Sequence, residues 1–202
     1  MKKYQKVGKT SVKKKDIPLD TICIVVNNTG YGRFVYRHEK LNKAIDLQEP
    51  TSFEEVTLGD LKIMRQFSKS VFTDYSILIV DVMDEEYSLK DVYALLDLML
   101  QYEELSLMVK NEDGFDTGMF EHFAISSTMK SFEKAINLMS KEAKQRLFQA
   151  FVHAYKCNAI SDRQTAYDKA ELIQRITRMN DDIIDVLRYD SSLPNVSVQE
   201  LL

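Results

Sequence analysis

Three histidines and two cysteines are the first residues to consider for chemistry, because they supply bases, nucleophiles and metal ligands near neutral pH. His38 lies in an expected strand, His122 in an expected helix, and His153 on the polar face of another expected helix. No histidine has a partner at a metal-ligand spacing such as i, i+4 with a glutamate between. Cys23 and Cys157 pair with no histidine in a recognised local pattern, which leaves open a pairing made by the fold. The sequence therefore predicts no catalytic residue and no metal ligand.

Two further segments have the composition of cation sites. The first follows an expected strand and comprises Asp81, Asp84, Glu85 and Glu86. Carboxylates in that place can surround a hard cation, but a solvated turn is the commoner use of such a cluster, and we favour it. The second, residues 111–118, resembles a calcium loop in composition only. Placing Gly114 at the sixth position puts Val109 at the first, which needs an oxygen ligand, so the register fails.

The glycine pair Gly30 and Gly32 is the nearest approach to a nucleotide loop. It lacks the third glycine and the strand-to-helix context of a dinucleotide site, and the chain has no glycine-rich phosphate loop with its lysine. We interpret these glycines as turn residues. The sequence predicts no cofactor, and we expect no enzymatic activity.

Charge is distributed unevenly along the chain. The first fifteen residues contain no acid, and their seven lysines are Lys2, Lys3, Lys6, Lys9, Lys13, Lys14 and Lys15. The other residues carry 20 basic and 31 acidic side chains, so a cationic arm precedes an anionic body. Such an arm suits nucleic acid phosphates or an acidic protein surface, with a solvated, flexible leader as the alternative. These lysines are the candidate partner-binding residues.

Length and composition indicate a globular protein. The chain has 202 residues, of which 45% are hydrophobic, and this is enough for a sizeable core. Its apolar runs are far too short to cross a bilayer, and no apolar segment of an export signal follows the basic N-terminus. Two cysteines without a disulfide spacing favour reduced packing residues in a cytosolic setting.

The fold class expected from the periodicity is α+β, with a small β-rich unit at residues 19–86 after a basic flexible arm at 1–18. Residues 22–26 and 34–36 alternate in strand fashion around an Asn, Thr and Gly cluster, which predicts that they pair as a β-hairpin. We expect Ile24 and Phe34 to be buried in it. A short strand at 44–47, a short helix that begins near Thr57 and a buried strand within 75–82 should follow.

The second half of the chain has helical periodicity, which predicts an all-helical domain at 87–190 and a loose tail at 191–202. A capping box at Ser88 starts a long helix. Ser140 and Ser161 stand where further helix caps are needed. The apolar stripes predicted for the later helices are Met129, Phe132, Ile136 and Met139; Ala143, Leu147, Phe151 and Ala154; Ala166, Ala170, Ile173 and Ile176; and Ile183, Ile184 and Leu187.

A pattern of residues runs through most of the segment 21–187. In the N-terminal part it consists of Val25 to Thr29 with Tyr36, the segment Val56 to Met64, and the apolar strand that ends at Asp81. In the C-terminal part it consists of Phe132 to Ile136, Asn158 to Arg163 and Asp181 to Ile184. This pattern and order of elements resemble a group of poorly characterised virion structural proteins of tailed bacteriophages. The glycines at 30–32 and the long helix from Ser88 depart from that pattern.

The resemblance implies a non-enzymatic structural protein of a phage particle, either head-associated or at the head-tail junction, that acts through protein surfaces. It would be made in the host cytoplasm and carried in the virion. Its partners would be other virion proteins, with copies of itself among the candidates, and no membrane. The alternative is a nucleic-acid-binding or regulatory protein that uses the lysine arm.

Overall fold

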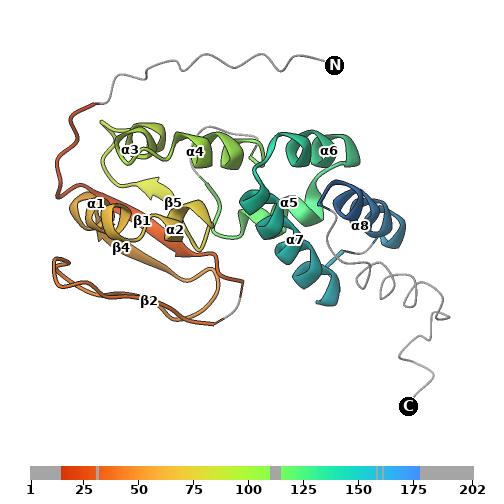
Figure 1. The fold of residues 1–202 in the computed structure, drawn as a ribbon, viewed down its shortest axis with the longest axis horizontal. Coiled ribbons are helices and arrows are strands. Elements are labelled where there is room, and N and C mark those ends of the chain that lie inside the picture. The colour runs from red at the N-terminus through yellow and green to blue at the C-terminus, as the bar shows by residue number, and fades with distance from the viewer. Residues whose placement is uncertain (1–14, 31, 110–114, 158, 161, 178–202) are drawn as a thin grey trace.

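The chain folds into a β-rich N-terminal unit followed by a mostly helical region, as Figure 1 shows in a computed structural model, and the α+β fold class is confirmed. Residues 15–30, 32–109, 115–157, 159–160 and 162–177 are described. The strands are β1 (Ile22–Asn27), β2 (Phe34–Tyr36), β3 (Ile45–Leu47), β4 (Phe53–Thr57) and β5 (Ile77–Val82). The helices are α1 (Leu58–Phe67), α2 (Ser70–Thr73), α3 (Leu89–Leu95), α4 (Met99–Ser106), α5 (Met119–Ser126), α6 (Met129–Leu138), α7 (Lys141–Lys156) and α8 (Arg163–Thr177).

Strand β1 is the centre of a three-stranded sheet with the order β4-β1-β5, and both of its pairings are antiparallel. The predicted pairing of β1 with β2 is therefore wrong. Strand β2 pairs instead with β3 in a separate two-stranded hairpin. The sequence prediction failed because local turn residues signal a reversal of the chain but do not select the strand that returns.

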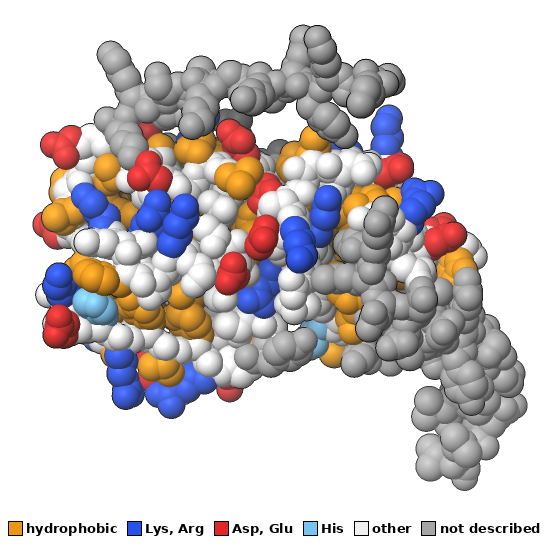
Figure 2. All heavy atoms as spheres, in the orientation of Figure 1, with side chains coloured by type: hydrophobic (Ala, Val, Ile, Leu, Met, Phe, Trp, Pro, Cys, Tyr) orange, Lys and Arg blue, Asp and Glu red, His pale blue; other side chains and the backbone are white. Residues whose placement is uncertain are grey.

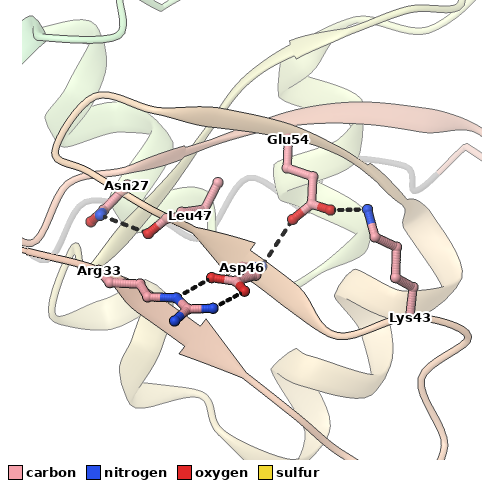
Figure 3. Close-up of polar contacts among 6 residues, drawn as sticks. All are labelled: Asn27, Arg33, Lys43, Asp46, Leu47 and Glu54. Carbon is pink, nitrogen blue, oxygen red and sulfur yellow. Dashed lines mark hydrogen bonds and ion pairs between the residues drawn. The ribbon is translucent and has the colours of Figure 1, made fainter.

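The side chain of Asn27, at the end of β1, joins the hairpin to the sheet. It is fully buried, and its amide donates to the backbone carbonyls of Gly32, at 2.9 Å, and Glu49, at 3.0 Å. Its carbonyl oxygen accepts from the N–H and the hydroxyl of Thr29. Figure 3 shows the outer contacts of the hairpin, in which Asp46 binds Arg33. The Asn-x-Thr segment is thus a turn that holds two sheets together.

The buried faces of the strands differ from expectation. Cys23 and Val25 are both 0% exposed, whereas Ile24 and Phe34 are only partly buried. Strand alternation identifies two faces of a strand correctly, but both faces of β1 are apolar, so the pattern does not say which of them is covered.

Short polar side chains set the helix starts as predicted. The hydroxyl of Thr57 accepts from the N–H of Asp60 at 3.1 Å, and Ser88 forms a capping box with Asp91. Ser140 caps α7 in the same way. Helix α1 has ten residues and is longer than expected.

The single long helix predicted from Ser88 is wrong, because α3 and α4 are separate. Asp97, between them, has a φ of 55°, a left-handed conformation that an α-helix cannot continue through. Tyr93 of α3 covers the outer edge of β5. Its hydroxyl donates to the carbonyl of Ile79 at 3.0 Å and lies 3.3 Å from the N–H of the same residue.

The stripes predicted for the described later helices form the core. Phe132, Ile136 and Met139 are buried, as are all four residues of the α7 stripe. The stripe of α8 is buried at Ala166, Ala170 and Ile173, and Ile176 packs against it. The buried apolar side chains form one continuous cluster from the sheet into the helices. The predictions for Ser161, for Ile183, Ile184 and Leu187, and for the tail lie outside the described residues.

Candidate functional site

Lys15 is the one arm lysine among the described residues, and it lies against the body of the protein. Its ammonium is 2.7 Å from the carboxylate of Asp91, the residue that completes the capping box of α3. Ile17, two residues later, is buried. The other six predicted arm residues, Lys2 to Lys14, lie outside the described part. The arm therefore reaches the body beside the start of α3.

One face of the three-stranded sheet leaves apolar side chains in contact with solvent. The register places Glu55 and Asp81 on either side of Ile24, and Phe53 opposite Val26. Met83, just after β5, donates its N–H to the carbonyl of Ile22, so it continues this face. We call this set the exposed sheet face, and its members are Ile22, Ile24, Phe53, Glu55, Asp81 and Met83.

Exposure differs strongly along this face. Phe53 is 66% exposed and Met83 is 58% exposed, although both are large and apolar. Val26 and Leu78, in the row with Phe53, are buried. Sheet faces normally bury apolar residues, whereas this face presents Phe53 and Met83 to solvent at its two ends and Ile24 between the carboxylates of Glu55 and Asp81. Figure 2 shows one view of the molecule, in which apolar and charged side chains are interspersed over the β-rich unit.

A buried carboxylate fastens the two halves of the chain together. Glu104 of α4 is 3% exposed and accepts hydrogen bonds from the hydroxyl of Tyr75 and from the N–H and hydroxyl of Ser140, the cap of α7. Burial, and then the neighbouring Glu104, raise the pKa of the Tyr75 hydroxyl, which keeps it a donor. The β-rich unit, α4 and α7 thus meet at one side chain.

Arg146 of α7 makes a second junction. Its guanidinium donates to the carbonyls of Asp74, at 2.8 Å, and Thr29, at 3.0 Å, and to the hydroxyl of Ser76 at 3.2 Å. These partners all belong to loops at the end of the sheet near β1 and β5. The fixed fork of a guanidinium suits such simultaneous contacts, so α7 is held at a defined angle to the sheet.

A small cavity of about 70 Å³ lies beside Arg146, between the β1–β2 and β3–β4 turns and helices α5 and α7. Asn28 and Thr51 line one side, and Glu121, Gln149 and His153 line the other. The sequence did not indicate this meeting of loops and helices, because its parts are far apart along the chain.

His153 lies between a carboxylate and a thiol, an arrangement that no sequence motif indicated. Its Nδ1 is 3.3 Å from a carboxylate oxygen of Glu121 on α5, and its Nε2 is 3.8 Å from the sulfur of Cys157. The spacing of His153 and Cys157 is i, i+4 on one helix, which places two side chains on the same side. This spacing was the signal in the sequence that could have identified the pair. The position of Glu121 could not be predicted from the residues near His153, because Glu121 lies on a different helix.

The other two histidines make separate contacts. His38, expected in a strand, lies in the loop after β2, and its ring stacks on Phe67 with the centroids 4.3 Å apart. Lys40 lies over the same phenyl ring, 4.9 Å from its centroid. His122 is on a helix as expected and pairs with Asp116.

Lys169 of α8 is a buried cation with a structural role. It is 0% exposed, and its ammonium donates to the carbonyl of Ala124 at 2.7 Å, near the C-terminal end of α5, where carbonyls lack helical partners. Burial lowers the pKa of its ammonium. Nothing in the local sequence around Lys169 indicated this role.

The acidic group at Asp81 to Glu86 makes local turn contacts, since Asp84 accepts from the N–H of Glu86 at 3.0 Å. Within the described ranges, no group of three or more His, Cys, Asp or Glu residues is arranged to hold a metal ion. Half of the loop at 111–118 lies outside those ranges. None of the described helices has the length and apolar character needed to cross a bilayer.

Comparison with known proteins adds no relative. No protein-family model matches the chain, and neither a curated protein nor a solved structure matches it.

Proposed function

We propose that this chain is a non-enzymatic structural component of a tailed bacteriophage particle, head-associated or at the head-tail junction, and that it works through protein-protein contacts. The sequence resemblance over residues 21–187 supports this proposal. The observation that carries it is the exposed sheet face, where Phe53 and Met83 are open to solvent beside two carboxylates.

The chemistry of this face defines its partner. A single exposed apolar residue is ordinary, but Phe53, Ile24 and Met83 lie on one sheet face and together offer apolar area for burial. Glu55 and Asp81 border Ile24 and favour a partner with basic side chains at its rim. The partner is therefore a neighbouring subunit of the particle with an apolar, positively charged surface.

The junctions at Glu104 and Arg146 suit a protein that joins others. They hold the helical region at a fixed orientation to the sheet, so contacts made at the two ends are related by a defined geometry. A rigid body of this kind can position its neighbours without a catalytic step.

The different-class alternative is a nucleic-acid-binding or regulatory protein, and the seven arm lysines favour it. Each lysine that neutralises a phosphate adds to a salt-dependent affinity that does not depend on base sequence. A protein of this kind would lose that affinity when the arm is removed.

Deletion of residues 2–14 separates the two functions and leaves the ion pair of Lys15 with Asp91 intact. Full-length and shortened chains are produced in an infected host, and purified particles are quantified by mass spectrometry. DNA affinity is measured with the purified chains over a range of salt. We expect the full-length chain in particles and no salt-sensitive DNA binding. Its absence from particles, or DNA binding that disappears with the arm, would overturn the proposal.

A further inference from the structure

Cys157 stands at the C-terminal cap of α7 and is exposed. One turn earlier on the same helix is His153, whose Nε2 is 3.8 Å from the sulfur. Helix α5 packs against α7 and brings Glu121 to the other ring nitrogen, Nδ1, at 3.3 Å. A carboxylate, an imidazole and a thiol thus follow one another in that order.

The two ring nitrogens of His153 have different tasks in this order. A carboxylate can only accept, so it favours the tautomer with the proton on Nδ1. Nε2 then carries a lone pair toward the thiol and can take its proton. This is the arrangement of nucleophile, base and orienting group that activates thiols in proteins.

The thiol of Cys157 and the two side chains beside it are open to solvent. The side chain of His153 is 50% exposed and that of Glu121 is 33% exposed. The same two side chains line the cavity of about 70 Å³ beside Gln149, which is space for a small group next to the imidazole. A low-molecular-weight reagent can therefore reach the sulfur from solvent.

The other cysteine provides an internal contrast. Cys23 is 0% exposed in the centre of the sheet, and burial raises the pKa of its thiol to about 12. A thiol of that kind is inert in the folded protein, because the thiolate is the reactive species. Any thiol reaction of the native chain reports on Cys157.

We propose that Cys157, activated by His153 and oriented by Glu121, is a thiol-disulfide exchange site for low-molecular-weight disulfides. The thiol proton moves to Nε2 of His153, and the sulfur attacks one sulfur of the disulfide. A new S–S bond forms and the old one breaks. The leaving thiolate takes the proton back from the imidazolium. The products are a mixed disulfide on Cys157 and one free thiol, so the disulfide itself is the oxidant and no other is needed.

The size of the effect follows from the chemistry of exchange. The rate gain from a neighbouring base is modest, because a thiolate that forms more readily is also a weaker nucleophile. Replacement of His153 should slow the reaction by about threefold. Glu121→Gln removes the charge but keeps an acceptor oxygen, so it should slow the reaction less.

The test measures second-order rates of the native full chain with 5,5′-dithiobis(2-nitrobenzoate) and with the uncharged 2,2′-dithiodipyridine. The variants are His153→Ala, His153→Gln, Glu121→Gln and Cys157→Ser. His122→Ala is the matched control. His122 is also an exposed histidine paired with a carboxylate, but among the described residues it contacts no thiol. Oxidised glutathione with mass spectrometry identifies the residue that carries the mixed disulfide.

We expect one reacting thiol, none in Cys157→Ser, slower reaction in both His153 variants with both reagents, and no change in His122→Ala. The circular dichroism of the His153 variants should match that of the wild type, because the side chain is half-exposed. Rates that are equal in wild type and His153→Gln, or glutathione on Cys23, would overturn the proposal. Slowing with the anionic reagent alone would also overturn it, since that result would show a charge effect and not a base.

Discussion

The buried carboxylate of Glu104 allows a quantitative test of how the two halves are joined. Glu104→Ala leaves the hydroxyl of Tyr75 and the N–H of Ser140 without their acceptor at a site that is 3% exposed. Each buried donor left without its acceptor costs about 1 to 3 kcal/mol, so these two donors should cost about 2 to 6 kcal/mol together. That is a large part of the stability of a typical domain, about 5 to 15 kcal/mol.

A double-mutant cycle isolates the contact between the hydroxyl and the carboxylate. Tyr75→Phe alone should cost about 1.5 to 3 kcal/mol, because it removes a hydrogen bond to a charged acceptor. In Glu104→Gln the hydroxyl of Tyr75 faces a neutral acceptor. Adding Tyr75→Phe to that variant should therefore lower the free energy of unfolding by clearly less than it does in the wild type. The expected coupling energy is about 1 to 3 kcal/mol.

Urea denaturation followed by far-ultraviolet circular dichroism measures these free energies. Ser106→Ala on the same helix is a suitable control, because its hydroxyl donates to the carbonyl of Tyr102 one turn earlier and so makes a local contact. A loss below about 1 kcal/mol for Glu104→Ala, or a coupling energy near zero, would show that water and not this network satisfies the carboxylate.

Three further perturbations test other parts of the structure. Asn27→Asp should destabilise the protein by about 2 to 4 kcal/mol in urea, because a carboxylate would face the carbonyls of Gly32 and Glu49 that the amide now donates to; an unchanged midpoint would contradict this contact. Above pH 9 the unfolded chain loses the Cys23 proton, whereas the folded chain keeps it up to about pH 12. Both chains compared carry Cys157→Ser, and one of them also carries Cys23→Ala. Between these pH values the chain with Cys23 should lose up to about 1.4 kcal/mol of unfolding free energy per pH unit relative to the chain with Cys23→Ala. Parallel plots of unfolding free energy against pH would refute the burial argument. Val25→Asp should unfold the sheet, while Phe53→Ser should change stability by less than about 1 kcal/mol, and circular dichroism would reveal the reverse order if the faces were assigned wrongly.

Local features of the chain were predictable because they depend on residues three or four positions apart. The caps at Thr57, Ser88 and Ser140 each bond to an N–H three residues later, and the sequence displays both partners. The stripe from Ala143 to Ala154 was predictable for the same reason, since helical periodicity fixes which side is buried.

Features that depend on distant segments were not predictable. The pairing of β1 with β4 joins runs about thirty positions apart, and no residue in β1 encodes that choice. The strand β4 itself was missed, because Phe53, Glu54 and Glu55 show no apolar alternation. The break at Asp97 rests on a left-handed backbone, which is uncommon for any residue other than glycine, although aspartate tolerates it better than most.

The candidate sites show the same division. The pair His153 and Cys157 was within reach of sequence reasoning, because both lie on one helix at i, i+4. Glu121, Glu104 and Arg146 take their roles from contacts with segments more than thirty residues away, and their types alone suggest ordinary surface charges.

The most direct test of the proposed function is the incorporation of a chain whose exposed sheet face has lost its apolar side chains. Phe53→Ser with Met83→Ser alters this face, and Leu138→Ser, at a residue of similar exposure on α6, is the matched control. Copies per purified phage particle are counted by quantitative mass spectrometry against the wild type. The proposal predicts at least a tenfold loss for the double variant and none for the control. Equal incorporation of all three chains would contradict it.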